Sequence, residues 1–108
     1  RELAVWDVAA GRELVRTPDL SDVLTDLAYT PDGTRLAAAG YTGVVRLFDP
    51  ASGTEVLTLR PNAGLLYSLQ FDPAGDRLLV GAARHPVVYG MTPGPPAGEP
   101  APPPRPAD

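Results

Sequence analysis

The stretch Leu27–Gly40 (LAYTPDGTRLAAAG) decides the fold, because the chain repeats it as Leu69–Ala82 (LQFDPAGDRLLVGA). The two copies lie 69 − 27 = 42 residues apart and align without a gap. Each copy has two apolar runs joined by a turn, in which proline fixes φ and glycine permits a positive φ. Each copy therefore predicts a β-hairpin.

The same spacing extends over more of the chain. It pairs Leu3–Asp7 (LAVWD) with Val45–Asp49 (VRLFD), and it pairs Gly11 with Gly53. Periods of about 40 to 45 residues are typical of repeats that each form one supersecondary unit and bury their faces against neighbours. The chain has room for about two units and part of a third, whereas propellers need roughly 4 to 8 blades to close. Together with the start at Arg1 inside a strand-like run, this predicts a fragment whose remaining blades lie upstream.

Short strands separated by tight turns account for the rest of each unit, and no segment carries a helical period. Four antiparallel strands would form one blade. We therefore expect an all-β fold, a β-propeller fragment with about two four-stranded antiparallel blades plus a partial blade. The expected strands are residues 23–30, 35–40, 44–49 and 54–60 in one unit and residues 65–71, 77–83 and 87–91 in the next.

The expected return strands are rich in small residues, at Ala37–Gly40 and at Gly81–Ala83. An exposed sheet would prefer bulky β-branched side chains, so the small residues predict a close approach between sheets. Apolar residues also occupy both faces of single strands, as in Leu47 followed by Phe48. Both faces are therefore expected to be buried, as in a blade between two others.

Composition and charge exclude several classes of function. Apolar residues make up 44% and charged residues 20% of the chain, as in soluble domains. Nine basic and thirteen acidic residues give a net charge of −4, which disfavours nucleic acid as a partner. No apolar run is long enough to cross a membrane, so no membrane partner is expected, and the lack of cysteine rules out disulfides and thiolate metal sites. No signal-peptide pattern is present, so a cytoplasmic location is favoured while export stays open.

The quoted runs, with AAGREL at residues 9–14 and ASGTEV at residues 51–56, resemble the WD-repeat β-propellers in their bacterial form. The resemblance covers residues 3–91, which are expected to form the propeller domain. In that family a Trp-Asp pair closes the third strand of a blade, and the pair falls here at Trp6-Asp7, Phe48-Asp49 and Gly90-Met91. A related propeller type in hydrolases and translocation proteins also uses Pro-Asp-Gly hairpins, but Trp6-Asp7 and the 42-residue period favour the WD-repeat type.

Two departures from the family pattern predict that its polar network is absent. The family's Gly-His pair would fall at Asp19-Leu20 and at Pro61-Asn62, and it is missing from both units. The Asp usual in the turn between the second and third strands is replaced by Tyr41 and by Ala83. The family's network of His, Asp, Ser and Trp therefore cannot form, and stability is expected from packing and turns.

Few residues suggest chemistry. His85 is the only histidine, and no carboxylate, serine or cysteine lies at a spacing typical of a triad or a metal site. Asp22 and Asp26 suggest paired carboxylates, but they are expected to be solvated edge residues of one strand. The repeat position of Asp7 and Asp49 predicts structural turn residues. We therefore expect no enzyme activity from this chain and no catalytic, cofactor or metal site.

Residues 92–108 are expected to form a separate, disordered Pro-rich tail, because eight of these seventeen residues are proline. Such sequences populate extended polyproline II and cannot build a core. Pro100–Arg105 (PAPPPR) matches the PxxPxR pattern read by peptide-binding domains. A match of this kind is expected by chance in a region so rich in proline.

The resemblance implies a non-catalytic scaffold for protein–protein interaction. The alternative is the propeller domain of a larger bacterial enzyme, a hydrolase or a protein kinase, which acts as a sensor or regulatory module. For the scaffold, the resemblance places partner binding on the loops that join blades and on those between second and third strands. Tyr and Arg are enriched at binding hot spots, so Tyr41 and Arg84 are the strongest candidates. The full set is Asp19, Leu20, Asp22, Tyr41, Asn62, Arg84 and His85.

The resemblance also has an implication for the last strand. In the family the final blade commonly takes three strands from the C-terminal end and its outer strand from the N-terminal end. Here the third strand, residues 87–91, runs into Pro-rich sequence that cannot supply a fourth. We expect this strand to be an open edge, and the isolated chain to be marginally stable or to associate.

Overall fold

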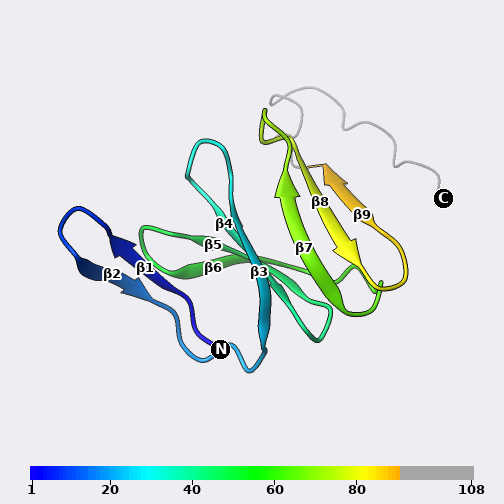
Figure 1. Cartoon of the computed structure of the whole chain (residues 1–108), viewed down its shortest axis with the longest axis horizontal. Coiled ribbons are helices and arrows are strands. Elements are labelled where there is room, and N and C mark those ends of the chain that lie inside the picture. The colour runs from blue at the N-terminus through cyan, green and yellow to red at the C-terminus, as the bar shows by residue number, and fades with distance from the viewer. Residues whose placement is uncertain (91–108) are drawn as a thin grey trace, which may run out of the picture.

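Nine strands form three antiparallel sheets in the computed structural model, which describes residues 1–90 (Figure 1). The first sheet has two strands, the central sheet four and the third sheet three. Residues 1–90 contain no helix, so the predicted all-β propeller fragment is confirmed. The strands are β1 (Ala4–Asp7), β2 (Arg12–Arg16), β3 (Leu24–Tyr29), β4 (Leu36–Gly40), β5 (Val45–Asp49), β6 (Thr54–Leu59), β7 (Leu66–Phe71), β8 (Arg77–Ala82) and β9 (Val87–Gly90).

The strands recur at the spacing predicted from the sequence. Adding 42 to the bounds of β3 gives those of β7, and β1 and β2 fall in the same way on parts of β5 and β6. The β-bulges recur as well: one after Leu24 returns after Leu66, and one after Val5 returns after Leu47. A bulge bends and twists its strand, so the repeats share local shape. The first sheet thus holds the third and fourth strands of a blade, and the third sheet holds the first three.

The predicted hairpin turns are present between β3 and β4 and between β7 and β8. Gly33 and Gly75 have φ values of 74° and 77°, a region that favours glycine. Each glycine N–H closes its turn by donating to the carbonyl three residues earlier, on Thr30 and Asp72, at 2.9 Å. Both predicted hairpin turns therefore form at the paired Pro and Gly positions.

The two turns use carboxylates at different positions. In the first, Asp32 accepts hydrogen bonds from the backbone N–H of Thr34 and from the hydroxyls of Thr30 and Thr34. These bonds, the backbone one foremost, lower the pKa of Asp32 to about 2. In the second, Asp72 accepts from the backbone N–H groups of Asp76 at 2.8 Å and Arg77 at 3.0 Å. The bond from Arg77 recurs from the first turn, where the N–H of Arg35 donates to the Thr30 hydroxyl at 3.0 Å. The turn is therefore conserved in shape and in this one side-chain bond, while the carboxylate moves to another position.

The larger core lies between the central and third sheets. Ala37 and Ala39 of β4 are fully buried there, which confirms that the small residues allow the sheets to approach closely. Leu66 and Leu78 face them from the third sheet and are also fully buried. The buried members are Ala37, Ala39, Val45, Leu47, Leu66, Leu69, Leu78 and Val80.

The opposite face of the central sheet packs against the first sheet. Its buried members are Leu36, Ala38 and Phe48, with Leu3 from the segment before β1. Both faces of the central sheet are therefore apolar and packed, as predicted. This core is smaller because the first sheet supplies only β1 and β2. Leu27, which pairs with Ala38, is consequently about half exposed, at 49%.

The third sheet departs from the repeat at its last strand. In the central sheet Leu36 pairs with Phe48, so the 42-residue shift would pair Leu78 with Gly90. Instead, Leu78 pairs with Tyr89, and β9 is displaced by one residue. A displacement of one residue moves every side chain of a strand to the other face. Tyr89 therefore packs against the larger core, where burial raises its pKa.

The turns before these strands give a physical reason for the displacement. In the β4–β5 turn Gly43 has a φ of 93° and donates its N–H to the carbonyl of Gly40, whose own N–H donates to the carbonyl of Val44. His85 and Pro86 stand at the positions of Gly43 and Val44 in the β8–β9 turn. A positive φ is costly for a residue with a side chain, so the second turn takes another shape and sets another register.

This register corrects one prediction. The third Trp-Asp pair was expected at Gly90-Met91, which is wrong because Tyr89-Gly90 takes the place of Phe48-Asp49. An aromatic residue therefore closes the third strand of every repeat, as Trp6, Phe48 and Tyr89. Asp7 and Asp49, which were expected to be structural turn residues, are the last residues of β1 and β5 and accept hydrogen bonds from backbone N–H groups of the turns that follow them.

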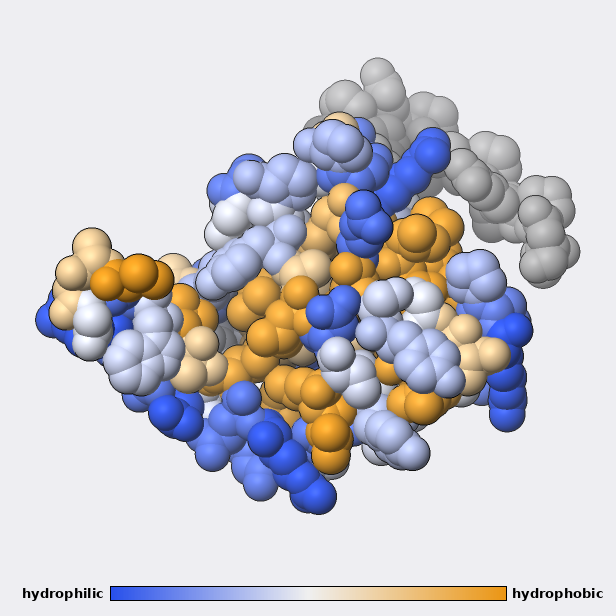
Figure 2. Space-filling model, viewed as in Figure 1, coloured by the Kyte–Doolittle hydropathy of each residue, from blue (hydrophilic) through white to orange (hydrophobic). Residues whose placement is uncertain are grey.

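Hydrophobic residues gather in the middle of the face shown in Figure 2, and hydrophilic residues lie mostly at its rim. Within residues 1–90, β9 is an edge strand that pairs with β8 alone, as expected. Trp6 is 55% exposed on the first sheet. The predicted Pro-rich tail and its Pro100–Arg105 motif lie outside the described residues.

Candidate interaction surface

Four connections lie at one end of the sheets, toward the lower edge of Figure 1: β2–β3, β4–β5, β6–β7 and β8–β9. Backbone hydrogen bonds join them in pairs. The N–H of Tyr41 donates to the carbonyl of Val23 at 2.8 Å, and the N–H of Ala83 donates to that of Leu65 at 2.8 Å. The two bonds are 42 residues apart at both ends, so each repeat ties its own pair of connections together.

The two pairs also meet each other. Arg84 donates its N–H to the carbonyl of Ala63 at 2.9 Å, and a side chain placed at Gly43 would approach the carbonyl oxygen of Gly64 to 3.0 Å. The β4–β5 turn therefore lies directly against the β6–β7 connection, which in turn is bonded to the β8–β9 turn. The four connections form one continuous surface.

Most of the predicted partner-binding residues are exposed on this surface. Tyr41 is 60% exposed at the β4–β5 turn, and Arg84 is exposed at the β8–β9 turn. Leu20 is half-buried and packs against the core between the first and central sheets. The exposed members are Asp19, Tyr41, Asn62, Arg84 and His85.

Asp22 is the exception, since it is only 4% exposed. The prediction that it is a solvated edge residue is therefore wrong, while its predicted part in partner binding stays a prediction. Its Oδ2 accepts a hydrogen bond from the hydroxyl of Thr42 at 2.8 Å, and its Oδ1 accepts one from the N–H of Thr42 at 3.3 Å. Nη1 of Arg46 lies 3.7 Å from the same carboxylate. A polar group so deeply buried requires hydrogen-bonding partners, and these contacts supply them.

A polar network thus joins the connections, although the family's own network is absent. Arg46 reaches Asp22 on one side and Glu55 on the other, with 3.2 Å between its Nε and a Glu55 oxygen. This network adds polar contacts to the packing and turns from which stability was expected. Sequence reasoning missed Arg46 and Glu55 because they lie on different strands, and only the sheet register brings them together.

Asp26 is also not a solvated edge residue. It is half-buried on β3, and its Oδ2 accepts a hydrogen bond from the backbone N–H of Leu69 on β7 at 2.8 Å. The bond joins β3 and β7, the first strands of the central and third sheets. Within residues 1–90, each of these strands pairs with one neighbour only and forms one edge of its sheet. Asp26 therefore links two blades.

Tyr67 is an exposed aromatic residue that sequence reasoning missed. It is the unpaired residue in the bulge of β7, at the strand end next to the β6–β7 connection, and it is 58% exposed. The equivalent residue of β3 is Thr25. Nothing in the sequence distinguishes Tyr67 from a strand residue, because the bulge that leaves it unpaired becomes visible only in the register.

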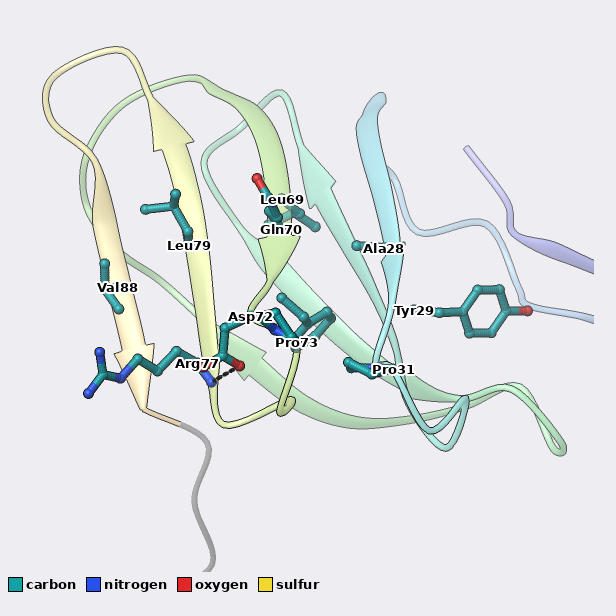
Figure 3. A pocket seen from close by; sticks show the side chains of 11 residues that line it. Ala28, Tyr29, Pro31, Leu69, Gln70, Asp72, Pro73, Arg77, Leu79 and Val88 are labelled. Carbon is teal, nitrogen blue, oxygen red and sulfur yellow. Dashed lines mark hydrogen bonds between the residues drawn. The ribbon is translucent and has the colours of Figure 1, made fainter.

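A groove of about 680 Å³ is a second candidate site (Figure 3). Its lining is mostly apolar, and in Figure 3 the ring of Tyr29 points away from it. Its polar groups do not converge, since Asp72 is bonded to the backbone of Arg77. The groove therefore offers mostly apolar surface, without a set of polar groups that point to one ligand position. It is lined by Ala28, Tyr29, Pro31, Leu69, Gln70, Phe71, Asp72, Pro73, Arg77, Leu79 and Val88.

Residues that could bind a metal ion do not cluster in the described part of the chain. Within residues 1–90 no group of three or more His, Cys, Asp or Glu residues is placed to hold a metal ion. His85 is exposed, and its Nδ1 lies 3.4 Å from the carbonyl oxygen of Pro86. Residues 1–90 also include no helix of the length and hydrophobicity that a membrane span requires.

Comparison with known proteins gives no match to a protein-family model, but it gives several relatives. The chain is 40% identical over 91 residues to coronin-7 of Rattus norvegicus and 30% identical over 92 residues to the human WD repeat and SOCS box-containing protein 1. It is 38% identical over 80 residues to an uncharacterized WD repeat-containing protein of Synechocystis. These matches cover 71%, 82% and 70% of the chain, and only 10%, 22% and 23% of the relatives.

Proposed function

The chain belongs to the WD-repeat family, and we propose that it is part of a non-catalytic scaffold that binds other proteins through the surface formed by its four connections. The family relationship supports this role, because WD-repeat relatives generally act as interaction scaffolds. The observation that carries the proposal is the continuity of this surface, which presents Tyr41 and Arg84 together. Further blades of the same protein are proposed to flank the first and third sheets.

The exposed side chains on this surface suit protein recognition. Within residues 1–90, neither the Tyr41 hydroxyl nor the Arg84 guanidinium forms a hydrogen bond or an ion pair. Both groups are therefore free to bind a partner. Tyrosine and arginine dominate the energetics of many interfaces, because they combine a large contact area with polar groups. Tyr67 adds a second exposed aromatic ring at this end.

The backbone beneath these side chains is tied to neighbouring segments. The β4–β5 turn donates an N–H to the β2–β3 connection, and the β8–β9 turn donates one to the β6–β7 connection. The sheets that carry these turns share a packed core. A surface held in this way loses little conformational entropy on binding, which favours affinity.

Site-specific photo-crosslinking in the intact protein tests the proposal. A photoreactive amino acid replaces Tyr41 or Arg84, and matched controls replace Ala51 or Ala74, which are exposed in turns at the opposite end. We expect the same protein to be crosslinked from positions 41 and 84 and not from the controls. After purification of that partner, Tyr41→Ala combined with Arg84→Ala should weaken binding at least about tenfold, as loss of hot-spot residues does. Equal crosslinking from the control positions, or unchanged affinity of the double variant, would contradict the proposal.

A further inference from the structure

A buried carboxylate holds the turn that presents Tyr41. Asp22 lies in the connection before β3, and both of its oxygens accept hydrogen bonds from Thr42, the residue after Tyr41. The bond from the hydroxyl is 2.8 Å long and that from the backbone N–H is 3.3 Å long. Together with the Tyr41 N–H bond to Val23, these contacts fix two successive residues of the turn to the neighbouring connection.

The surrounding residues are matched to this carboxylate. Nη1 of Arg46 lies 3.7 Å from Asp22, too far for a hydrogen bond, and Nε of Arg46 is held by Glu55 at 3.2 Å, so a positioned cation faces the carboxylate. Gly40 is needed as well, because a side chain at this position would collide with the Asp22 carboxylate. Three separate elements therefore converge on Asp22: the end of β4, the β4–β5 turn and β5.

The arrangement is specific to this turn. At the equivalent positions of the next repeat, Gly64 replaces Asp22 and Arg84 replaces Thr42. Because β9 is displaced by one residue, Val87 takes the place of Arg46 in the sheet. The β8–β9 turn is consequently held by backbone bonds without a buried carboxylate. A device needed only for the stability of a repeat would be expected in both repeats, whereas this one occurs where the exposed tyrosine lies.

We propose that Asp22 is a positioning residue, which fixes the β4–β5 turn through Thr42 so that Tyr41 is presented to a protein partner in one orientation. This inference rests on the proposed function for the role of Tyr41, but the fixation of the turn stands on the contacts themselves. Asp22 does not touch the partner, because it is buried. Its effect on binding is through the conformation of Tyr41, and pre-ordering of a binding residue lowers the entropic cost of association.

Hydrogen exchange of the intact protein, measured by mass spectrometry or NMR, tests the fixation without any partner. Thr42→Val removes the 2.8 Å bond to Asp22 and keeps the shape of the side chain. Thr34→Val is a matched control, since it removes a bond of the same length to Asp32 at the opposite end of the sheet. We expect Thr42→Val to speed exchange of the amides of residues 41–43 by about tenfold, the factor that loss of one hydrogen bond gives. Exchange at residues 83–85 should not change.

The partner recovered by crosslinking provides the second arm. Thr42→Val and Tyr41→Ala should each weaken its binding, and the double variant should be no weaker than Tyr41→Ala alone, because both changes remove the same interaction. Thr34→Val should bind like the unmodified protein.

The outcomes separate this inference from the proposed function. Unchanged exchange at residues 41–43 in Thr42→Val, or faster exchange with fully additive losses of binding, would overturn it. If no partner depends on Tyr41, the proposed function fails, and the exchange arm alone still decides whether Asp22 fixes the turn.

Discussion

The β4–β5 and β8–β9 turns occupy equivalent places in two successive repeats, yet they differ in shape, in support and in consequence. The first has Gly43 at a positive φ and is held by the buried Asp22. The second has His85 at that position and is held by backbone hydrogen bonds. The strand that follows it, β9, pairs with β8 in a register displaced by one residue. The 42-residue repeat therefore sets where strands occur, whereas one or two turn residues decide which face a following strand presents.

The largest effect is expected where the two repeats meet. Leu66 of β7 is fully buried against the central sheet, so Leu66→Ala should lower the free energy of unfolding by about 4 kcal/mol through lost burial and a residual cavity. Chemical denaturation of the intact protein measures this. Val56→Ala on the exposed outer strand β6 should change it by less than about 0.5 kcal/mol. Similar losses for both variants would show that the repeats do not share this core.

Removing the carboxylate that distinguishes the first turn should have the next largest effect. Asp22→Ala removes both hydrogen bonds from Thr42 and leaves Glu55 as the only carboxylate beside Arg46, and the loss of hydrogen bonds to a buried charged group costs about 2 kcal/mol. Asp76→Ala should be nearly neutral, because this exposed carboxylate forms no hydrogen bond or ion pair within residues 1–90. Thermal or chemical unfolding of both variants checks the difference. Equal stability of the two would mean that Asp22 is solvated in solution.

The displaced register of β9 can be tested by comparing neighbouring residues. Tyr89 is half-buried against the core and Val88 is 59% exposed on the other face. Tyr89→Ala should therefore cost about 2 kcal/mol of stability, and Val88→Ala less than about 0.5 kcal/mol. The reverse order would show that β9 follows the 42-residue shift without displacement.

Local sequence patterns predict part of this structure but not all of it. The repeat predicted the strands and the turns at Gly33 and Gly75, because hydrophobic alternation and turn residues act locally. It misjudged Asp22 and the pair at Gly90-Met91, since their surroundings depend on which residues the sheet register brings together. The surroundings of Asp22 include Arg46, which lies twenty-four residues further along the chain, and no local sequence pattern predicts that contact.

A smaller effect distinguishes the two hairpin turns. The bonds to Asp32 hold its pKa at about 2, below the value of 3.8 for a free side chain. Because the folded-state pKa is lowered, the ionised carboxylate favours the folded turn above about pH 4, and this contribution is lost as the pH falls toward 2. NMR titration of the Asp32 carboxyl carbon should give a midpoint near 2. A midpoint near 4, the value for a free aspartate, would show that these bonds do not persist in solution.

The central claim is that the end bearing Tyr41 and Arg84 is the face that meets a protein partner. Hydrogen exchange of the intact protein with and without its purified partner tests this most directly. We predict slower exchange in the partner's presence at residues 41–43 and 83–85, with no change in the turns at residues 31–34 and 73–76. Protection confined to those opposite turns, or to the edge strand β9, would contradict the claim.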